Sequence, residues 1–229
     1  MLNRFRINNI VKNARGFSSW DIPKMTHFLD NNNHQTRDKL RELFKDDDFI
    51  PKYNITLDQE RDLAYQRLKK VCQLGVVSVN DFKTNPKNIF TVHELNGMAD
   101  GALCTKFTVQ FNLFGGTVLK LGTDKHHKLL CDGIDSLDKV GCFGLTELGY
   151  GNNAVEMETT AHYDHESKEF IINTPSAKAQ KYWITNGAVH AHYSVVFARL
   201  IMPDGTNEGL HGFLVPIRDE KTMEVKENV

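Results

Sequence analysis

The pattern of apolar and polar positions changes part-way along the chain. From Asn33 to about Phe114, apolar residues recur at three- and four-residue steps, which is typical of amphipathic helices. From about Val140 onward, short apolar or alternating runs rich in β-branched and aromatic residues indicate strands separated by turns. Helices first and strands second predict an α+β fold, in which an N-terminal all-α unit precedes a β-sheet unit.

The clearest helix is predicted over 57–73. Thr56 followed three residues later by Gln59 is a capping-box sequence, and the residues after it place apolar side chains on one face. Asp46-Asp47-Asp48 is expected to stop the helix before it, and Gly115-Gly116 to interrupt the helical pattern after it. The expected helices are 34–44 with Asn33 as its N-cap, 57–73, 89–96, 103–114 and 118–130.

Turn sequences divide the second half of the chain into strands. Asp164-His165-Glu166-Ser167 and Asp204-Gly205-Thr206-Asn207 carry the residues that favour turns. The expected strands are 158–163, 170–173, 193–202 and 211–217. The last residues, 219–229, are highly charged without apolar periodicity and indicate a solvated tail.

Composition and charge narrow the function classes. The 229 residues include 28 Lys and Arg against 29 Asp and Glu, which leaves a net charge of -1. Proteins that grip nucleic acid through its phosphates carry a clear basic excess, so nucleic acid is not an expected partner. No apolar run approaches the ~20 residues of a membrane-spanning helix. Four cysteines without a CxxC pair indicate reduced thiols rather than a disulfide framework or a zinc ribbon.

The first nineteen residues read as a targeting segment. Arg4, Arg6, Lys12 and Arg15 stand among apolar residues with no acidic residue before Asp21, which is the composition of a mitochondrial presequence. Arg6-Ile7, five spacers and Asn13-Ala14 also approach the N-terminal peroxisomal signal, although Asn13 replaces the usual His or Gln. A basic end without an address is the third interpretation.

Histidines and common catalytic motifs do not define a site. Two histidine pairs, His162/His165 and His190/His192, invite a metal hypothesis, and a pair two residues apart on a strand shares one face. No Cys or carboxylate is spaced to complete a metal site, and the histidine in the turn is expected to be solvated. We therefore expect no metal. The sequence also contains no GxSxG, HExxH or GxxxxGK[ST] motif, and no GxGxxG followed by an acidic ribose partner.

Two segments carry more specific signals. In the first, Thr146 precedes a loop with Gly149 and Gly151, whose backbone amides could approach an anion, although a plain strand-to-turn transition explains the pattern equally well. In the second, Trp183 and Thr185 point to the same side of an extended backbone, which offers a flat apolar face beside a hydroxyl donor. A buried core tryptophan is the alternative for the second segment.

Together with other collinear stretches, these segments resemble the acyl-CoA oxidases, flavoprotein relatives of the acyl-CoA dehydrogenases. The resemblance runs from about His34 to Glu220. The supporting stretches are Arg37-Asp-Lys-Leu-Arg-Glu, Pro51-Lys-Tyr-Asn-Ile, Glu60-Arg-Asp-Leu-Ala-Tyr-Gln-Arg-Leu, Gln110-Phe-Asn-Leu-Phe-Gly-Gly-Thr-Val-Leu-Lys-Leu-Gly-Thr, Thr146-Glu-Leu-Gly, Glu158-Thr-Thr-Ala, Phe170-Ile-Ile-Asn-Thr-Pro-Ser and Val215-Pro-Ile-Arg-Asp.

The resemblance implies a domain plan, a cofactor and a reaction. It implies an N-terminal helical domain at 20–139 and an incomplete middle β domain at 140–218, to which the composition of the two ends adds a leader at 1–19 and a charged tail at 219–229. It also implies bound FAD and a fatty acyl-CoA substrate, which the family converts with oxygen to trans-2-enoyl-CoA and hydrogen peroxide. Homo- or hetero-oligomers with acyl-CoA oxidase subunits are expected as well. Family habit favours the peroxisome, with the mitochondrion as the alternative.

The resemblance also implies the cofactor-binding residues. Thr146 matches the threonine that hydrogen-bonds the flavin pyrimidine edge, with Leu145 and Leu148 as backbone donors. Gly149, Gly151 and Asn152 fall in the glycine loop, where Asn152 replaces the usual Ser or Thr at a phosphate contact. Trp183 and Thr185 fall where relatives place residues against the flavin ring. Oxidases typically have Gly at the position of Thr185, so Trp183-Ile-Thr-Asn is the dehydrogenase-like version.

No catalytic residue is assigned within this chain. The family's C-terminal helices and their catalytic glutamate are not in the sequence, and none of Glu156, Glu158 and Glu166 occupies a family base position. One interpretation is an oxidase whose chemistry needs residues outside these 229. The alternatives are a non-catalytic truncated paralogue that acts as a binding or oligomerisation module, a dehydrogenase-like flavoprotein, and a gene-model or pseudogene fragment.

Overall fold

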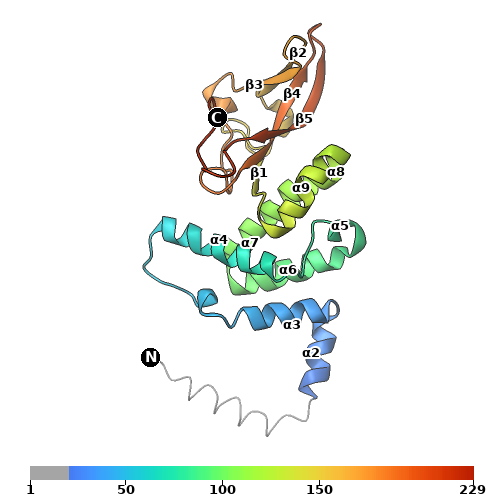
Figure 1. Cartoon of the computed structure of the whole chain (residues 1–229), viewed down its shortest axis with the longest axis vertical. Coiled ribbons are helices and arrows are strands. Elements are labelled where there is room, and N and C mark those ends of the chain that lie inside the picture. Colours follow the sequence, from blue (N-terminus) through green and yellow to red (C-terminus); the bar gives the residue numbers. More distant parts are fainter. Residues whose placement is uncertain (1–20) are drawn as a thin grey trace.

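The computed structural model describes residues 21–229, which form a helical unit followed in the chain by a mixed sheet (Figure 1). Among the described residues, the last α-helix ends at Ser136 and the first strand begins at Gly141, so the change of pattern near Val140 marks the passage between the units. The α+β class expected from the sequence is confirmed. The predicted targeting segment lies outside the described residues.

The helical unit packs its helices around an apolar core that Leu40, Leu68, Val92 and Phe107 share. Most of its residues are in α-helices, supplemented by the 3-10 turn η1 (Asp47–Phe49) and the π-helical stretch η2 (Thr108–Gly115). The α-helices are α2 (Ile22–Asp30), α3 (His34–Leu43), α4 (Leu57–Gln73), α5 (Asp81–Thr84), α6 (Pro86–Ala99), α7 (Gly101–Phe107), α8 (Gly116–Leu121) and α9 (Asp124–Ser136).

Of the two predicted N-terminal helix caps, one is present in the structure and the other is not. The capping box at the start of α4 is complete, because the Gln59 amide donates to the Thr56 hydroxyl and the Thr56 amide donates to the Gln59 side chain. Asn33 also stands at the start of its helix, but it adopts a left-handed backbone with φ 48° and its side chain caps nothing. Its amide group donates instead to Asn32 and Thr91. The predicted capping role of Asn33 is therefore wrong.

Two predicted helices are divided differently in the structure. The expected helix 118–130 is two helices, because Gly122 takes an extended backbone with ψ 158° and a new helix starts after it. The expected helix 103–114 changes from α to π hydrogen bonding after Phe107. Within the π stretch, the buried Gln110 side chain donates to the carbonyls of Ile134 and Lys139 and accepts from the Gly141 amide.

The sheet is organised around its nine-residue strand β4 (Tyr193–Ile201). The strand order is β1-β4-β2-β3. Strands β1 and β2 pair with successive segments of β4, and β5 pairs with β4 along the opposite edge. Parallel pairs join β4 to β1 and to β2, whereas β2/β3 and β4/β5 are antiparallel. The remaining bounds are β1 (Gly141–Gly144), β2 (Thr160–Asp164), β3 (Glu169–Asn173), β5 (Asn207–Pro216), and the 3-10 turns η3 (Ala154–Glu156) and η4 (Ala177–Ala179).

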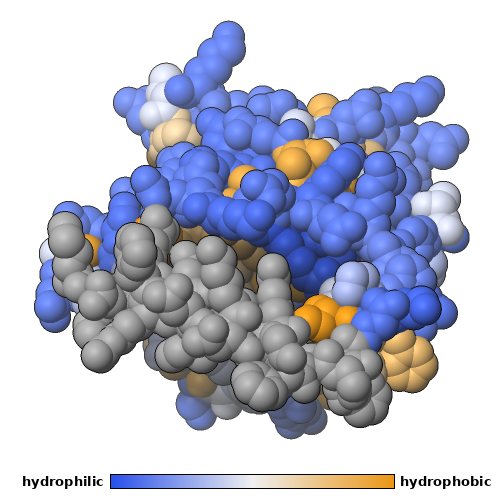
Figure 2. Space-filling view, turned by 90° about the horizontal axis from the view of Figure 1, so that it is seen from below, coloured by the Kyte–Doolittle hydropathy of each residue, from blue (hydrophilic) through white to orange (hydrophobic). Residues whose placement is uncertain are grey.

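The two units share a packed junction. Val195 of β4 lies in one apolar cluster with Val79, Phe114 and Ile134 from the helical unit. Gly141 approaches the Phe114 ring so closely that a Cβ atom built on it would lie 2.0 Å from the ring. The face of the molecule shown in Figure 2 is mostly hydrophilic where its atoms are coloured, with hydrophobic side chains in small separate groups.

The charged tail is exposed but folds back onto the sheet. The Lys226 amide donates to the Ile217 carbonyl at 3.0 Å, and Arg218 forms a β-bridge with Val225. Glu220 bonds to the ammonium of Lys139 and to the Tyr193 hydroxyl. The tail is therefore attached to the junction between the units.

Candidate functional site

The two segments singled out in the sequence lie side by side. Glu147 and Lys181 form an isolated antiparallel β-bridge. Around it, the Tyr182 amide donates to the Thr146 carbonyl at 3.0 Å and the Leu148 amide donates to the Gln180 carbonyl at 2.9 Å. Backbone pairing therefore joins the Thr146 segment to the Trp183 segment.

A buried carboxylate fixes this junction from inside. Glu147 is 2% exposed and accepts from the amides of Glu158 and Thr159 at 2.8 and 3.0 Å and from the Thr159 hydroxyl at 2.5 Å. The Lys181 ammonium completes the set at 3.0 Å. Burial by itself raises the pKa of Glu147, but these donors outweigh it and hold the pKa below its ordinary value. The sequence analysis missed this residue, although it directly follows Thr146.

The hydroxyl groups of Thr146 and Thr185 are free for a ligand. Among residues 21–229, neither hydroxyl makes a hydrogen bond, and both residues are partly exposed. Trp183 is 86% exposed and has a left-handed backbone with φ 64°. The alternative of a buried core tryptophan is therefore wrong. An exposed apolar ring, in a segment that also carries a free hydroxyl, is a surface that an aromatic ligand could cover.

The glycine loop is less open than its sequence suggests. The Gly149 amide donates to the Lys178 carbonyl at 2.9 Å, and the Gly151 amide donates to the Glu147 carbonyl at 3.1 Å. The Leu148 amide is likewise occupied by Gln180. Gly151 has φ 51°, a conformation that favours glycine, and Asn152 beside it is exposed. The assignment of these residues and of Leu145 to cofactor binding stays a prediction.

A cavity of about 480 Å³ opens where the helical unit meets the Trp183 segment. Helices α4 and α7 form one side, and residues 183–190 form the other. Aliphatic residues and polar residues contribute about equally to the lining. The lining residues are Leu57, Glu60, Arg61, Ala64, Ala102, Thr105, Lys106, Trp183, Ile184, Thr185, Asn186, Ala188, Val189 and His190. The cavity therefore combines two predicted site residues with walls that sequence reasoning did not identify.

A lysine inside this cavity has only neutral partners. Lys106 is 8% exposed, and its Nζ lies 2.8 Å from Asn186 Oδ1 and 3.2 Å from His190 Nδ1. Within the part of the chain that the structure describes, no carboxylate forms an ion pair with Lys106. Burial lowers the pKa of Lys106, and Arg61 adds to this effect. A lysine on a helix is ordinarily a solvated residue, so no local signal marked Lys106.

His190 connects the lysine to the surface. Its ring stacks on Tyr65 with centroids 4.3 Å apart, and its Nε2 lies 3.3 Å from Asp62 Oδ1. Burial and the neighbouring Lys106 charge lower the pKa of His190. The neutral imidazole can thus accept from Lys106 at Nδ1 while donating to Asp62 from Nε2.

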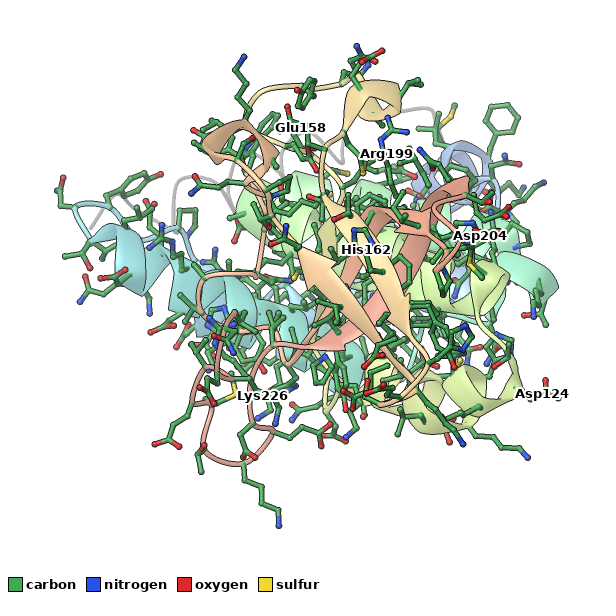
Figure 3. All side chains as sticks on the ribbon, turned by 90° about the horizontal axis from the view of Figure 1, so that it is seen from above. Asp124, Glu158, His162, Arg199, Asp204 and Lys226 are labelled. Carbon is green, nitrogen blue, oxygen red and sulfur yellow. The ribbon has the colours of Figure 1, made fainter. Side chains whose placement is uncertain are left out.

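The other candidate groups serve local structure. Glu158 is bonded to the hydroxyls of Tyr150 and Ser176. Figure 3 shows Glu158 near Arg199 on one side of the sheet and Lys226 on the opposite side. His162 projects from β2 over the sheet and away from the helical unit.

Residues 21–229 contain no group of three or more side chains that could hold a metal ion, and no helix among them has the length and apolarity to cross a membrane.

Comparison with known proteins identifies the relatives of this chain. Residues 142–229 match the family described as "Acyl-CoA dehydrogenase, middle domain". The peroxisomal acyl-coenzyme A oxidase 2 of Arabidopsis thaliana is 42% identical over 174 residues, which are 73% of this chain and 25% of the relative. The human peroxisomal acyl-coenzyme A oxidase 3 is 36% identical over 173 residues, 76% of this chain and 25% of the relative. The chain is a homologue of the acyl-CoA oxidases.

Solved acyl-CoA oxidase structures extend the likeness to both units. The crystal structure of acyl-CoA oxidase 1 from Yarrowia lipolytica superimposes with a TM-score of 0.78 at 30% identity, over 94% of this chain and 32% of that chain. Acyl-CoA oxidase 2 of Caenorhabditis elegans, solved with FAD, ascaroside-CoA and ATP, has the same fold, with a TM-score of 0.73 at 24% identity over 93% of this chain. The chain spans about a quarter to a third of the length of these relatives.

Proposed function

We propose that this chain supplies the flavin-facing and acyl-facing wall of an acyl-CoA oxidase, which converts a fatty acyl-CoA and oxygen to trans-2-enoyl-CoA and hydrogen peroxide. The observation that carries the proposal is the pairing of the Thr146 and Trp183 segments at the Glu147–Lys181 bridge. The pairing supports a common site for the two segments, and Trp183 and Thr185 of the second segment line a cavity of about 480 Å³.

The residues present fit FAD in part. The Thr146 hydroxyl would donate to the flavin pyrimidine edge, Thr185 would supply a second hydroxyl, and Trp183 would pack on the ring. The occupied amides of Leu148, Gly149 and Gly151 fit less well, because each would have to exchange a bond within the chain for one to the cofactor. FAD, when bound, supplies the hydride acceptor of the reaction and passes the electrons to oxygen.

The aliphatic part of the cavity suits an acyl chain. Leu57, Ala64, Ala102 and Val189 line it, and an acyl chain buried against them is removed from water. No residue of the 229 is assigned as the base that takes the α proton, and Glu158 is already bonded to Tyr150 and Ser176. We therefore expect little turnover from this chain alone, because loss of a general base costs about 10²–10⁴-fold in rate.

Thr185 bears on the choice between oxidase and dehydrogenase behaviour. Its hydroxyl makes no hydrogen bond within residues 21–229, and its side chain lines the cavity. A side chain larger than glycine at this position narrows the space through which oxygen would reach a bound flavin. The test compares the wild type with Thr185→Gly, each assembled with an oxidase partner, in the rate at which oxygen reoxidises the reduced flavin. Faster reoxidation in the variant supports a restricting role for Thr185.

Flavin retention tests the proposed function directly. The purified chain is mixed with FAD, passed through gel filtration, and examined by its visible absorption spectrum. We expect the wild type and Thr206→Val, in the exposed turn between β4 and β5, to retain flavin, and Thr146→Val and Trp183→Ala to retain less. A colourless wild-type chain would contradict flavin binding and leave a binding or oligomerisation module as the function.

The proposed function also includes a cellular compartment, the peroxisome, and assembly with other acyl-CoA oxidase subunits. The Arabidopsis and human relatives are named as peroxisomal, which supports the peroxisome as the compartment. Exposed apolar side chains, among them Phe28, Leu29 and Phe90, support assembly with another acyl-CoA oxidase subunit. Imaging of the tagged full-length chain with a peroxisomal marker and a mitochondrial marker tests the first proposal, and light scattering with and without an oxidase partner tests the second.

A further inference from the structure

The cavity beside Trp183 contains a buried positive charge that nothing within the described chain neutralises. Lys106 reaches it from α7 and is 8% exposed, with Asn186 and His190 as its bonding partners. Buried ammonium groups are ordinarily paired with a carboxylate, because an unpaired buried charge is costly. The charged groups that act on Lys106 do not pair with it: Arg61 bonds to Asp58, and Asp62 faces the far nitrogen of His190. Glu60 also lines the cavity and forms no ion pair with Lys106 within residues 21–229.

The partners of Lys106 hold it in one orientation. Asn186 Oδ1 accepts one ammonium proton at 2.8 Å, and His190 Nδ1 accepts a second at 3.2 Å. His190 is itself fixed between the Tyr65 ring and Asp62. An ammonium group has three protons, so one donor is left without a partner among residues 21–229. A charged donor held this way is prepared for an anionic acceptor.

The walls of the cavity define the rest of the ligand. Leu57, Ala64, Ala102, Ile184 and Val189 present aliphatic surface around this buried cation, and Glu60, Arg61, Thr105 and Thr185 add polar groups to the lining. A ligand that satisfies both features is apolar along most of its length and anionic at one group. A carboxylate on an alkyl chain has this character, and it forms strong charge-assisted bonds with an ammonium donor.

We propose that Lys106 binds a carboxylate carried by an alkyl chain in this cavity, and so selects ligands whose chain ends in a carboxylate over ligands whose chain ends in a methyl group. The inference rests on the proposed function in that it takes the cavity to be the acyl site. The carboxylate can belong to a free fatty acid or to the far end of a dicarboxylic acyl thioester. The shared chemistry is an alkyl carboxylate.

Ligands without phosphate groups isolate this contact. We would titrate the 229-residue chain with dodecanoate, with the N-acetylcysteamine thioester of dodecanoic acid, and with the mono-N-acetylcysteamine thioester of dodecanedioic acid. The fluorescence of Trp183, which lines the cavity, reports binding, and the background substitution Trp20→Phe removes the other tryptophan. We expect the dicarboxylic thioester to bind about tenfold or more tightly than the methyl-ended thioester.

Substitutions at Lys106 test the assignment. Lys106→Met keeps the apolar stem and removes the charge, so it should abolish the preference for the dicarboxylic thioester. Lys106→Arg should keep the preference, and Lys125→Met on exposed α9 should behave as the wild type. Circular dichroism checks that each variant folds. The comparison of the two thioesters on the wild-type chain stands whether or not Lys106→Met folds.

The outcomes separate this inference from the proposed function. Equal binding of the two thioesters by the wild type, or an unchanged preference in folded Lys106→Met, overturns the role of Lys106 and leaves an acyl site intact. Binding of dodecanoate without either thioester keeps Lys106 as a fatty-acid contact and contradicts the acyl-thioester function. Absence of binding by all three ligands overturns both. Preference for the dicarboxylic thioester over dodecanoate identifies the chain end, rather than a free acid, as the source of the carboxylate.

Discussion

Replacing the buried carboxylate beneath the site should separate the two segments that form it. In Glu147→Gln the side chain keeps its size and loses its charge. The carboxylate accepts from two backbone amides, one hydroxyl and the Lys181 ammonium. A glutamine has one acceptor oxygen, so its amide group must face at least one of these donors. Lys181, whose side chain is 15% exposed, is then left without its counter-charge.

The structure sets the size of the expected effect. Removing one partner of a buried, hydrogen-bonded ion pair costs about 3–5 kcal/mol, a large share of the roughly 5–15 kcal/mol that stabilises a typical domain. We expect a loss of this size in the free energy of unfolding, measured by urea denaturation followed by circular dichroism. Glu166→Gln, in an exposed turn, is the matched control and should change the free energy by less than about 0.5 kcal/mol.

Acidity gives the same prediction an independent test. The pKa of Glu147 is held below its ordinary value, so its stabilisation is fully present above that value and is lost as the pH falls through the folded-state pKa. The difference in stability between the wild type and Glu147→Gln should therefore shrink in acid. In a double-mutant cycle with Lys181→Met, the two substitutions should be less than additive. A loss for Glu147→Gln as small as that of the control, or additive effects, would refute the role assigned to the pair.

Three further predictions concern packing, thiol reactivity and pH. Gly141→Ala should destabilise the chain by about 1–3 kcal/mol in thermal denaturation, because its Cβ would lie 2.0 Å from the Phe114 ring. Gly101→Ala is the control, because a Cβ there has open space and should not destabilise the chain. Equal effects of the two substitutions would contradict the close approach. Burial raises the pKa of Cys72 to about 12, so Cys72 should resist thiol reagents at neutral pH until the chain unfolds, and fast labelling of the native chain would disprove this. The lowered pKa of His190 should give an NMR titration midpoint below the ordinary histidine value, with stability lost as the pH falls through that ordinary value; a raised midpoint would show that Asp62 dominates.

Local signals predicted the fold where they act within a few residues. The capping box of Thr56 and Gln59 and the apolar periodicity after it predicted both ends of helix 57–73. The predicted strand 193–202 corresponds to β4, which begins at the same residue and ends one residue earlier, at Ile201. The π-helical stretch after Phe107 was not predictable in this way. Its Gln110 side chain bonds to Ile134, Lys139 and Gly141, which are distant in sequence, so tertiary contacts accompany the change of helix type there.

The residues of the candidate site also differ in whether the sequence could predict them. Resemblance to a family, not spacing, pointed to Thr146 and Trp183 as neighbours, and the structure pairs their segments. Glu147 and Lys106 escaped notice because charged residues are usually solvated, and only the tertiary structure shows that both are buried. Burial of a charge is a property of what packs around it, so its sequence context carries almost no trace of it.

The loop after Thr185 is held from two sides by two cations, Lys106 and Arg218. Lys106 bonds to the Asn186 side chain from the helical unit, and the buried Arg218 donates to the carbonyls of Gly187, Ala188 and Ala191 from the end of the sheet. Both cations use neutral acceptors of the loop: Lys106 bonds to its side chains and Arg218 to its backbone carbonyls. Because Trp183 has a left-handed backbone and an exposed ring, its own packing does little to position it. The position of Thr185 and Trp183 therefore depends in part on a contact between the helical unit and the sheet unit, the Lys106–Asn186 bond.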